Sequence, residues 1–147
     1  LNVVKGQLAM FEIKPPLSFS HSISSRGYLA HTNNQFLAVG STYEHNYDNL
    51  EPDQEGLTQL TEKINTILPD LWEKASFINQ WAGERIHATD HKPILGPHLE
   101  MNNQYIFTGL GSKGLLYGKY LANCLAEYLV NDKPLPSEVD RSRFGNN

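Results

Sequence analysis

The sequence predicts an α+β fold: a mixed, largely antiparallel sheet with one packed helix, followed by a strand–glycine loop–helix unit. Three observations support this prediction. Extended apolar segments follow one another in the first half, with a hairpin signal between two of them. One helical run of leucines and isoleucines comes next. The last third has the order strand, loop, helix, as in the final unit of an α/β sheet. The change from consecutive strands to this pattern falls near Ala88.

The first half of the chain predicts three extended segments. Residues 3–11 are apolar and predict a strand, which the run Lys14-Pro15-Pro16 ends. A second extended stretch lies within residues 19–32, and Asn33-Asn34 indicates a turn. Residues 35–42 form the third segment, so the second and third segments together predict a hairpin.

A helix is predicted after the polar loop of residues 46–53. Pro52 suits a first helical turn, and Asp53 and Glu55 suit its positive end. Pro69 ends the run. Apolar residues recur between these limits at helical spacing: Leu57, Leu60, Ile64, Ile67 and Leu68.

The second half begins with a predicted strand over residues 76–82, and Arg85 is expected just past its end. A tight Pro/Gly turn over residues 90–96 leads to a short strand at residues 105–108. Residues 114–130 predict an amphipathic helix, and residues 131–147 a polar tail with two prolines. The predicted buried face of that helix carries Tyr117, Leu121, Cys124, Leu125 and Tyr128.

Composition narrows the class of protein. The 147 residues are 39% hydrophobic, which is enough for a core, and the net charge of -4 does not favour nucleic acid as a partner. No run of apolar residues approaches membrane-spanning length, and we expect no signal peptide. Cys124 is the only cysteine, so we expect no internal disulfide and a reducing, cytoplasmic setting. Because Leu1 opens directly into a strand-like run, we expect a fragment of a longer protein.

Arg85 is the first candidate site residue. Regular alternation along the strand places five residues on one face: Phe77, Asn79, Trp81, Gly83 and Arg85. Trp81 would wall a cavity, Gly83 would leave space, and the guanidinium of Arg85 would bind a carboxylate bidentately at the rim. The alternative, which spacing alone favours, is a surface arginine paired with Glu84 or Asp90.

The loop Gly109–Gly114 is the second candidate. Its three glycines allow positive φ and close backbone approach, and its place before a helix directs N–H groups at an anion or an electron-rich ring. Ser112 could also serve as the N-cap of that helix. A plain tight turn is the alternative, since the spacing matches neither a P-loop nor a dinucleotide fingerprint.

The remaining polar residues give weaker signals. Tyr28 could offer its phenol to a substrate, although a half-buried sheet tyrosine is the commoner case. The six histidines have no metal-ligand spacing, so we expect no metal site and interpret them as structural or solvated. No arrangement of Ser, His and Asp suggests a nucleophile, and we assign no catalytic side chain. Cys124 is expected to be a small buried hydrophobe.

Several spaced motifs together resemble the C-terminal portion of the FAD-dependent D-amino-acid oxidase superfamily, of the glycine-oxidase-like type. The resemblance covers nearly the whole chain with the motifs in register. The motifs are Val4-Lys5-Gly6-Gln7, Gly27-Tyr28-Leu29, Val39-Gly40-Ser41-Thr42, Trp81-Ala82-Gly83-Glu84-Arg85, Thr89-Asp90-His91-Lys92-Pro93-Ile94-Leu95-Gly96 and Gly109-Leu110-Gly111-Ser112-Lys113-Gly114-Leu115.

The resemblance implies an incomplete protein. Residues 1–88 would form most of a substrate-binding domain, and residues 89–147 would return into an α/β FAD-binding domain. The N-terminal dinucleotide-binding part and its glycine fingerprint are absent from this sequence. We therefore expect FAD in the full-length protein, with the missing segment as a partner of this chain. Alone, the chain is expected to be inactive and to lack a site for the ADP half of FAD.

The resemblance also implies roles for named residues. Arg85 would hold the carboxylate of a small carboxylated amine, and Tyr28 would help to bind it. The loop would lie against the isoalloxazine ring, where its backbone donors stabilise negative charge near N1–C2=O of the reduced flavin. The reaction would pass a hydride from the α-carbon to flavin N5, and water would then hydrolyse the imine. The implied cofactor-binding residues are Gly109, Gly111, Ser112, Lys113, Gly114 and Leu115.

Two alternatives stay open. The Gly-Ser-Lys-Gly loop and the turn Asp90-His91-x-Pro93 are also similar to the oxidoreductase domain of the bifunctional tRNA wobble-uridine modification enzymes. That resemblance implies FAD-dependent demodification of carboxymethylaminomethyl-uridine in tRNA. The other alternative is a non-catalytic binding or assembly module, whose open sheet edge a partner chain or a second copy would cover.

Overall fold

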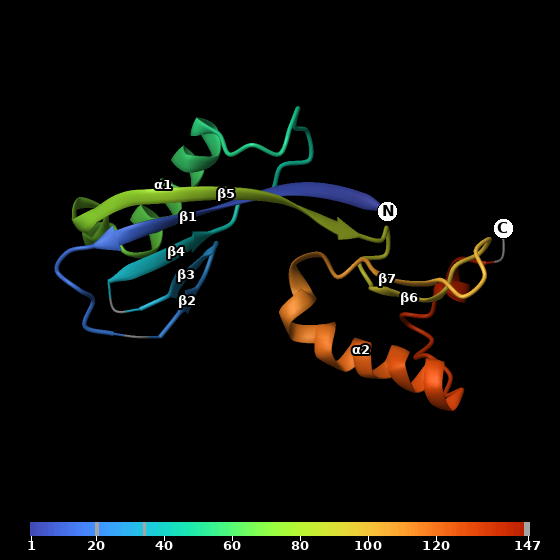
Figure 1. The fold of residues 1–147 in the computed structure, drawn as a ribbon. Coiled ribbons are helices and arrows are strands. Elements are labelled where there is room, and N and C mark those ends of the chain that lie inside the picture. Colours follow the sequence, from blue (N-terminus) through green and yellow to red (C-terminus); the bar gives the residue numbers. More distant parts are fainter. Residues whose placement is uncertain (20, 34, 146–147) are drawn as a thin grey trace. The chain divides into compact units, whose positions relative to one another are not determined.

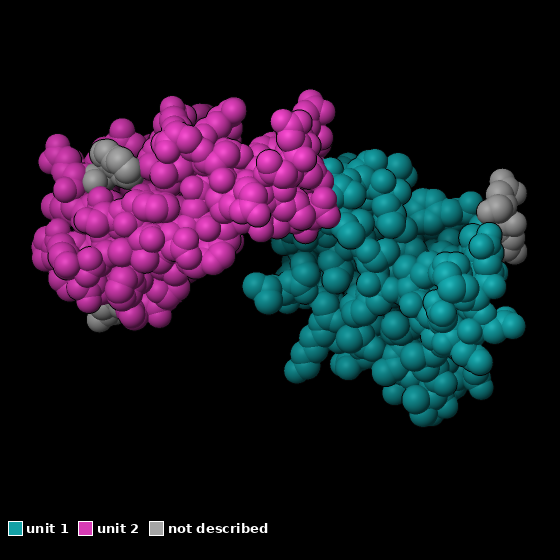
Figure 2. Space-filling view, turned by 45° about the horizontal axis from the view of Figure 1, so that its top comes forward, with its two compact units in different colours: residues 1–3, 85–147 teal, residues 4–84 magenta. Residues whose placement is uncertain are grey.

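The computed structural model describes residues 1–19, 21–33 and 35–145, without the side chain of Trp72. Within it the chain forms two compact units, drawn in different colours in Figure 2. Unit 2 comprises residues 4–84, and unit 1 comprises residues 1–3 and 85–147. The predicted domain boundary after Ala88 lies four residues beyond the division at Glu84 and Arg85. The assignment of the two parts to a substrate domain and a FAD domain stays a prediction.

A five-stranded sheet has the order β2-β3-β4-β1-β5 (Figure 1). Strand β4 pairs antiparallel with both β1 and β3, which confirms the predicted hairpin. At its turn, Asn33 Oδ1 accepts hydrogen bonds from the N–H groups of Gln35 and Phe36, both 2.9 Å, while Asn34 lies outside the described residues. The strands are β1 Asn2–Ile13, β2 Ile23–Ser24, β3 Tyr28–His31, β4 Phe36–Gly40 and β5 Ala75–His87.

Helix α1 (Gln54–Ile67) covers one face of this sheet (Figure 1). Asp53 caps it by accepting a 2.7 Å hydrogen bond from Gly56 N–H. Pro52 therefore precedes the cap and does not form the first turn, so that detail of the prediction was wrong. Leu60 and Ile64 are fully buried, and the short 3₁₀ helix η1 (Pro69–Lys74) follows. The core beneath α1 contains Ala9, Phe11, Ile13, Leu29, Leu37 and Val39.

Strand β5 differs from its prediction in length. It runs to His87, so Arg85 lies inside the strand and not past its end. A strand was predicted only to Ala82, because Gly83 and the charged pair that follows it weaken the apolar alternation. The extra residues carry Arg85 and His87 along the same backbone as Trp81.

Side-chain alternation along β5 is also not regular. The Phe77 ring lies 6.0 Å from that of Phe11, while Gln80 Nε2 donates to Gln7 Oε1 at 2.6 Å. Phe11 and Gln7 are four residues apart on β1 and so share a face. Residues 77 and 80 therefore point to one side, although regular alternation would separate them. The predicted face shared by Phe77 and Trp81 is wrong, because the alternation slips by one residue between them.

Unit 1 contains a two-stranded antiparallel sheet and a long helix. Strands β6 (Ile94–Pro97) and β7 (Tyr105–Thr108) pair in register, and α2 (Gly114–Asn131) follows through the 3₁₀ turn η2 (Gly111–Lys113). The bounds of β7 and α2 match their predictions closely. Strand β6 was predicted as part of a turn. Its proline and glycine residues are typical of turns, and its apolar segment is too short to show the two-residue period of a strand.

The segment after α2 was predicted as a polar tail, and this was wrong. Leu135 and Val139 are buried in one cluster with Leu95 and Leu121, and Leu95 N–H donates to Val139 O at 2.8 Å. A final 3₁₀ helix, η3 (Arg141–Phe144), closes the segment. On α2, Cys124, Leu125 and Tyr128 pack against this cluster as predicted, whereas the side chain of Tyr117 is exposed.

The observed order confirms the predicted α+β class. An antiparallel sheet with one packed helix is followed by a strand, a glycine loop and a helix. In the part of the chain that the structure describes, neither helix combines the length and apolarity needed to cross a membrane.

Candidate functional site

The glycine loop of unit 1 has the backbone that its residues predict. Gly109 and Gly111 have φ angles of +75° and +54°, a region that residues with a Cβ rarely adopt. A Cβ on Gly109 would also lie 3.4 Å from the carbonyl oxygen of Lys92. Gly114 has an ordinary helical φ of -56°, and nothing lies within 4 Å of a Cβ placed there. Two glycines are thus required by the backbone, and the third leaves open space.

The start of α2 lacks a side-chain cap. Lys113 occupies the N-cap position and makes no capping hydrogen bond, while Ser112 lies in the preceding turn η2. Ser112 is therefore not the cap: it lies within η2, and the N-cap position falls one residue later, at Lys113. The first N–H groups of a helix have no partner within it, so this helix start can receive an anionic or electron-rich group. Leu115, beside it, is fully exposed.

The end of β5 lies against this loop. His87 forms an antiparallel bridge with Leu110, and a Cβ on Gly111 would lie 3.6 Å from His87 Cβ. Arg85 is two residues earlier, so its side chain leaves the strand on the same side as that of His87. Arg85 is half-buried. The meeting of its guanidinium with the loop amides in one cavity stays a prediction.

The two acidic residues that offered the alternative explanation of Arg85 have partners of their own. Glu84 Oε1 accepts a 2.7 Å hydrogen bond from the hydroxyl of Tyr47. Asp90 Oδ2 lies 2.8 Å from Nε of Arg143. These contacts fix the positions of the Glu84 and Asp90 carboxylates, the two acidic groups nearest to Arg85 in the sequence.

Two histidines that sequence reasoning did not select lie beside the loop. The rings of His87 and His91 have centroids 4.9 Å apart. Nδ1 of His87 is buried and has no hydrogen-bond partner among the described residues. His91 has a φ of +56°, which is uncommon for a residue with a side chain. The only signal in the sequence was their spacing across the turn after β5.

Tyr28 belongs to unit 2, at the start of β3. Its neighbour Leu29 is buried beneath α1, so Tyr28 faces the opposite side of the sheet. Its ring lies over Gly40 of β4, where a Cβ would be only 2.2 Å from the ring carbon Cζ. The Tyr28 ring can occupy this position only because Gly40 has no side chain. Tyr28 and Arg85 lie in different units, and their action on one substrate stays a prediction.

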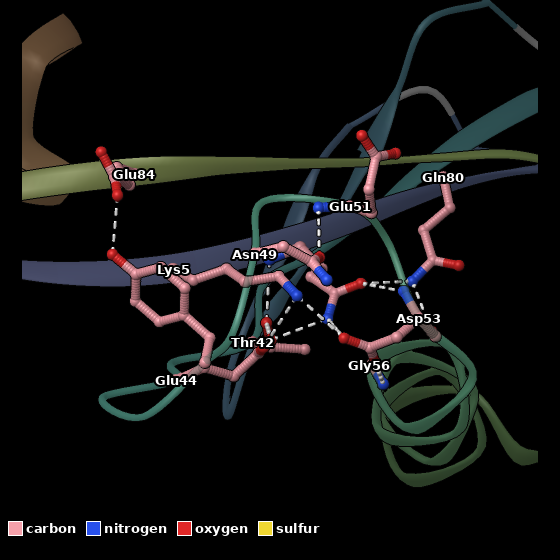
Figure 3. Close-up of polar contacts among 11 residues, drawn as sticks. Lys5, Thr42, Glu44, Asn49, Glu51, Asp53, Gly56, Gln80 and Glu84 are labelled. Carbon is pink, nitrogen blue, oxygen red and sulfur yellow. Dashed lines mark hydrogen bonds and ion pairs between the residues drawn. The ribbon is translucent and has the colours of Figure 1, made fainter.

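A buried polar network in unit 2 was also missed (Figure 3). The ammonium of Lys5 is 2.8 Å from Asp53 Oδ2 and 3.4 Å from Glu44 Oε2, and the Lys5 side chain is only 3% exposed. Gln7 Nε2 donates to the same two carboxylates, at 2.9 Å each. Gln80 Nε2 donates to Gln7 Oε1. The network thus joins β1, the start of α1 and β5.

The electrostatics of this network favour its charged form. The hydrogen bond from Lys5, followed by that from Gly56 N–H, lowers the pKa of Asp53. The hydrogen bond to Asp53 raises the pKa of Lys5 despite its burial. The resemblance had marked the segment that contains Lys5 and Gln7, but a lysine within a strand carries no signal of burial in sequence alone.

The residues present fit the flavin edge that the resemblance implies. Two positive-φ glycines give close backbone access, Gly114 leaves open space, and the start of α2 has no capping side chain. Such a surface suits an electron-rich ring edge that gains negative charge. The residues that could hold it are those of the loop and the first turn of α2.

Comparison with known proteins agrees with these features. The sequence profile of the family described as FAD dependent oxidoreductase matches residues 1–128. The chain is 32% identical over 152 residues to the tRNA 5-methylaminomethyl-2-thiouridine biosynthesis bifunctional protein MnmC of Idiomarina loihiensis, covering 96% of the chain and 24% of that protein. It is 30% identical to hydrogen cyanide synthase subunit HcnC of Pseudomonas aeruginosa, covering 92% of the chain and 32% of that protein.

Solved structures show the same fold. Glycine oxidase from Geobacillus kaustophilus superimposes with a TM-score of 0.77 at 24% identity, covering 100% of this chain and 40% of that one. Iminodiacetate oxidase from Chelativorans sp. BNC1 gives 0.78 at 24% identity, covering 97% and 38%. The chain thus spans between a quarter and two fifths of the length of these proteins. With the profile matched over most of its length, the chain belongs to the FAD-dependent oxidoreductase family, whose cofactor is FAD.

Proposed function

We propose that this chain contributes the substrate-binding part and the flavin-facing loop of an enzyme that oxidises the amine carbon of a small amino acid or carboxylated amine. The observation that carries the proposal is the bridge between His87 and Leu110. It places the end of the strand that carries Arg85 beside a loop of backbone donors. A cation for a carboxylate and donors for a reduced ring are the two elements that this reaction needs.

Each residue has a defined task in the proposal. Arg85 binds the substrate carboxylate through its guanidinium, and Tyr28 offers its phenol to the same substrate. Binding the carboxylate fixes the orientation of the α-carbon, which lowers the entropic part of the barrier. FAD, when bound, supplies hydride acceptance. The backbone N–H groups of residues 109–115 stabilise the negative charge that develops beside them.

The rest of the flavin site is proposed to come from a FAD-binding segment outside these 147 residues. Leu115 is fully exposed and Leu116 is 71% exposed, although both belong to the first turn of α2. Tyr105 and Phe107 of β7 are also exposed. Apolar side chains gathered on one helix start and one strand favour burial by further protein. A cytoplasmic setting, with Cys124 as the single cysteine, is part of the same proposal.

The test uses the complete polypeptide that contains this chain, purified with its flavin. Anaerobic mixing with glycine, sarcosine, iminodiacetate and proline should bleach the flavin absorbance for at least one of them. Their decarboxylated or esterified analogues should react at least about tenfold more slowly, since they lack the charge that Arg85 binds. Flavin that stays oxidised with every carboxylated amine, or reacts equally with the neutral analogues, would refute the proposal.

A second candidate is FAD-dependent demodification of carboxymethylaminomethyl-uridine in tRNA. It is favoured by the 32% identity to a relative whose name refers to tRNA thiouridine biosynthesis. The charge distribution does not add to this support. Unit 1 is nearly neutral, with seven lysines and arginines against six acidic residues, and unit 2 is acidic, with five against ten. Flavin reduction by modified tRNA, with no reduction by the free amines, would replace the first candidate by the second.

A further inference from the structure

The C-terminal segment, residues 132–145, lies beyond the part of the chain that the family profile matches. It is nevertheless built into unit 1. Leu135 and Val139 complete the core with Leu95 and Leu121, and Asp140 bridges Leu95 of β6. This packing fixes where η3 begins. It therefore determines where the side chain of Arg143 can reach.

Arg143 reaches from η3 to the turn that follows β5. Its Nε and Nη2 atoms bind Asp90 Oδ2 and Oδ1 at 2.8 and 3.2 Å, and Nη2 also donates to Lys92 O at 3.1 Å. Nη1 donates to Asp140 O at 3.2 Å. The Arg143 side chain is 15% exposed. A two-pronged charged contact of this kind fixes direction as well as distance.

The turn has two further hydrogen bonds, one to the same carboxylate and one within the backbone. Lys92 N–H donates to Asp90 Oδ1 at 3.1 Å, and His91 N–H donates to Ala88 O at 2.9 Å. The hydrogen bond from Arg143 lowers the pKa of Asp90 to about 2, so the carboxylate is charged at neutral pH. The positive φ of His91 is thereby held between two anchored neighbours.

A short chain of contacts links this turn to the glycine loop. The Lys92 carbonyl that accepts from Arg143 would lie 3.4 Å from a Cβ on Gly109, and Pro93 Cα would lie 3.5 Å from it. On the other side of the turn, the ring of His91 meets that of His87, whose Cβ faces Gly111. Both positive-φ glycines of the loop therefore pack against residues of, or next to, the turn that Arg143 holds.

We propose that Arg143 is a positioning residue. By binding Asp90 and the Lys92 carbonyl, it fixes the turn 88–93 and, through that turn, the backbone of the glycine loop 109–114. The C-terminal segment is in this way a structural part of the site. The geometric claim stands on the contacts alone, and its consequence for turnover rests on the proposed function.

Hydrogen–deuterium exchange measured by mass spectrometry on the complete polypeptide, without and with flavin, tests the geometric claim. In R143Q, exchange of peptides covering residues 88–93 and 109–114 should rise about ten- to a hundredfold, whereas α1 should be unchanged. R143K keeps the charge but not the fork, so it should restore only part of the protection. The matched control is K133A, which removes the exposed Lys133–Glu127 ion pair of the same segment and should leave both peptides as in the parent.

Two outcomes would overturn the claim. One is faster exchange in the C-terminal segment alone, with residues 88–93 and 109–114 as protected as before. The other is an equal rise throughout unit 1, which would mean that R143Q only destabilises the unit. D90N provides an independent check, since it should reproduce the pattern of R143Q and add little when the two changes are combined.

The consequence for turnover is measured separately. R143Q should lower kcat about tenfold or more at saturating substrate with a smaller change in KM, because it disturbs the loop and leaves Arg85 in place. A rise in KM with kcat unchanged would contradict this consequence. If the enzyme oxidises no carboxylated amine, the proposed function fails, while the exchange measurement still decides the role of Arg143.

Discussion

At the residue scale, the most unusual group is the buried ammonium of Lys5. A buried charge is tolerated only when opposite charges and hydrogen bonds replace its water, and here Asp53 and Glu44 do so within 2.8 and 3.4 Å. Gln7 binds the same carboxylates from the same strand. The arrangement positions the start of α1 and the middle of β5 on β1, so a polar network replaces apolar packing at this end of the sheet.

Replacing Lys5 by methionine should therefore destabilise the protein. The change keeps the volume but leaves two carboxylates and Gln7 without their cation. We expect the free energy of unfolding to fall by about 2 kcal/mol in urea titrations, below the full cost of breaking a buried pair because Asp53 is 45% exposed. Lys14→Met removes the exposed pair with Glu12 and should cost less than about 1 kcal/mol. Equal effects of the two changes would contradict the role assigned to Lys5.

The low pKa of Asp90 predicts that the free energy of unfolding decreases in acid. Its folded pKa of about 2 lies below the ordinary value of 3.8, so its stabilising contribution is fully present above about pH 4. That contribution is lost as the pH falls from 4 towards 2. The urea concentration at the midpoint of unfolding should decrease across this pH window, and the decrease should be smaller in D90N. The same slope in both proteins would show that Asp90 is not held by Arg143 in solution.

At the element scale, prediction succeeded where a segment was long and periodic. Helix α2 and the hairpin of β3 and β4 were found because their apolar residues repeat at one period over enough positions. Strand β6 and the C-terminal segment were missed because their burial depends on contacts with Leu121, which lies between them in the sequence. Leu135 is a single apolar residue between prolines, and nothing local indicates that it is buried.

The C-terminal segment should therefore behave as core. Leu135→Ala is expected to lower the free energy of unfolding by about 2–3 kcal/mol, since the leucine is 7% exposed and closes one cluster with Leu95. Leu129→Ala on the exposed face of α2 is the matched control, with an expected cost below about 1 kcal/mol in the 147-residue chain. Similar losses of unfolding free energy for the two changes, measured by urea titration, would show that the C-terminal segment does not contribute to the core.

At the scale of the whole molecule, the candidate site could be predicted only in part. The glycine loop and Arg85 were found because glycine spacing and an isolated arginine are visible in sequence. The His87–His91 pair, the bond from Arg143 to Asp90 and the Lys5 network were not found, because each joins residues whose proximity is created by the fold. The resemblance gave the family, which the profile match over residues 1–128 confirms, and it left the substrate open.

The most direct test of the central claim is the substrate dependence of an Arg85→Gln variant in the complete, flavin-loaded protein. KM for the carboxylated amine that the parent oxidises should rise about a hundredfold, which corresponds to the loss of a bidentate charged contact worth about 3 kcal/mol. KM for its decarboxylated analogue, and the absorbance of the bound flavin, should not change. An unaltered KM for the carboxylated amine, or an equal rise for both amines, would show that Arg85 does not bind the substrate carboxylate.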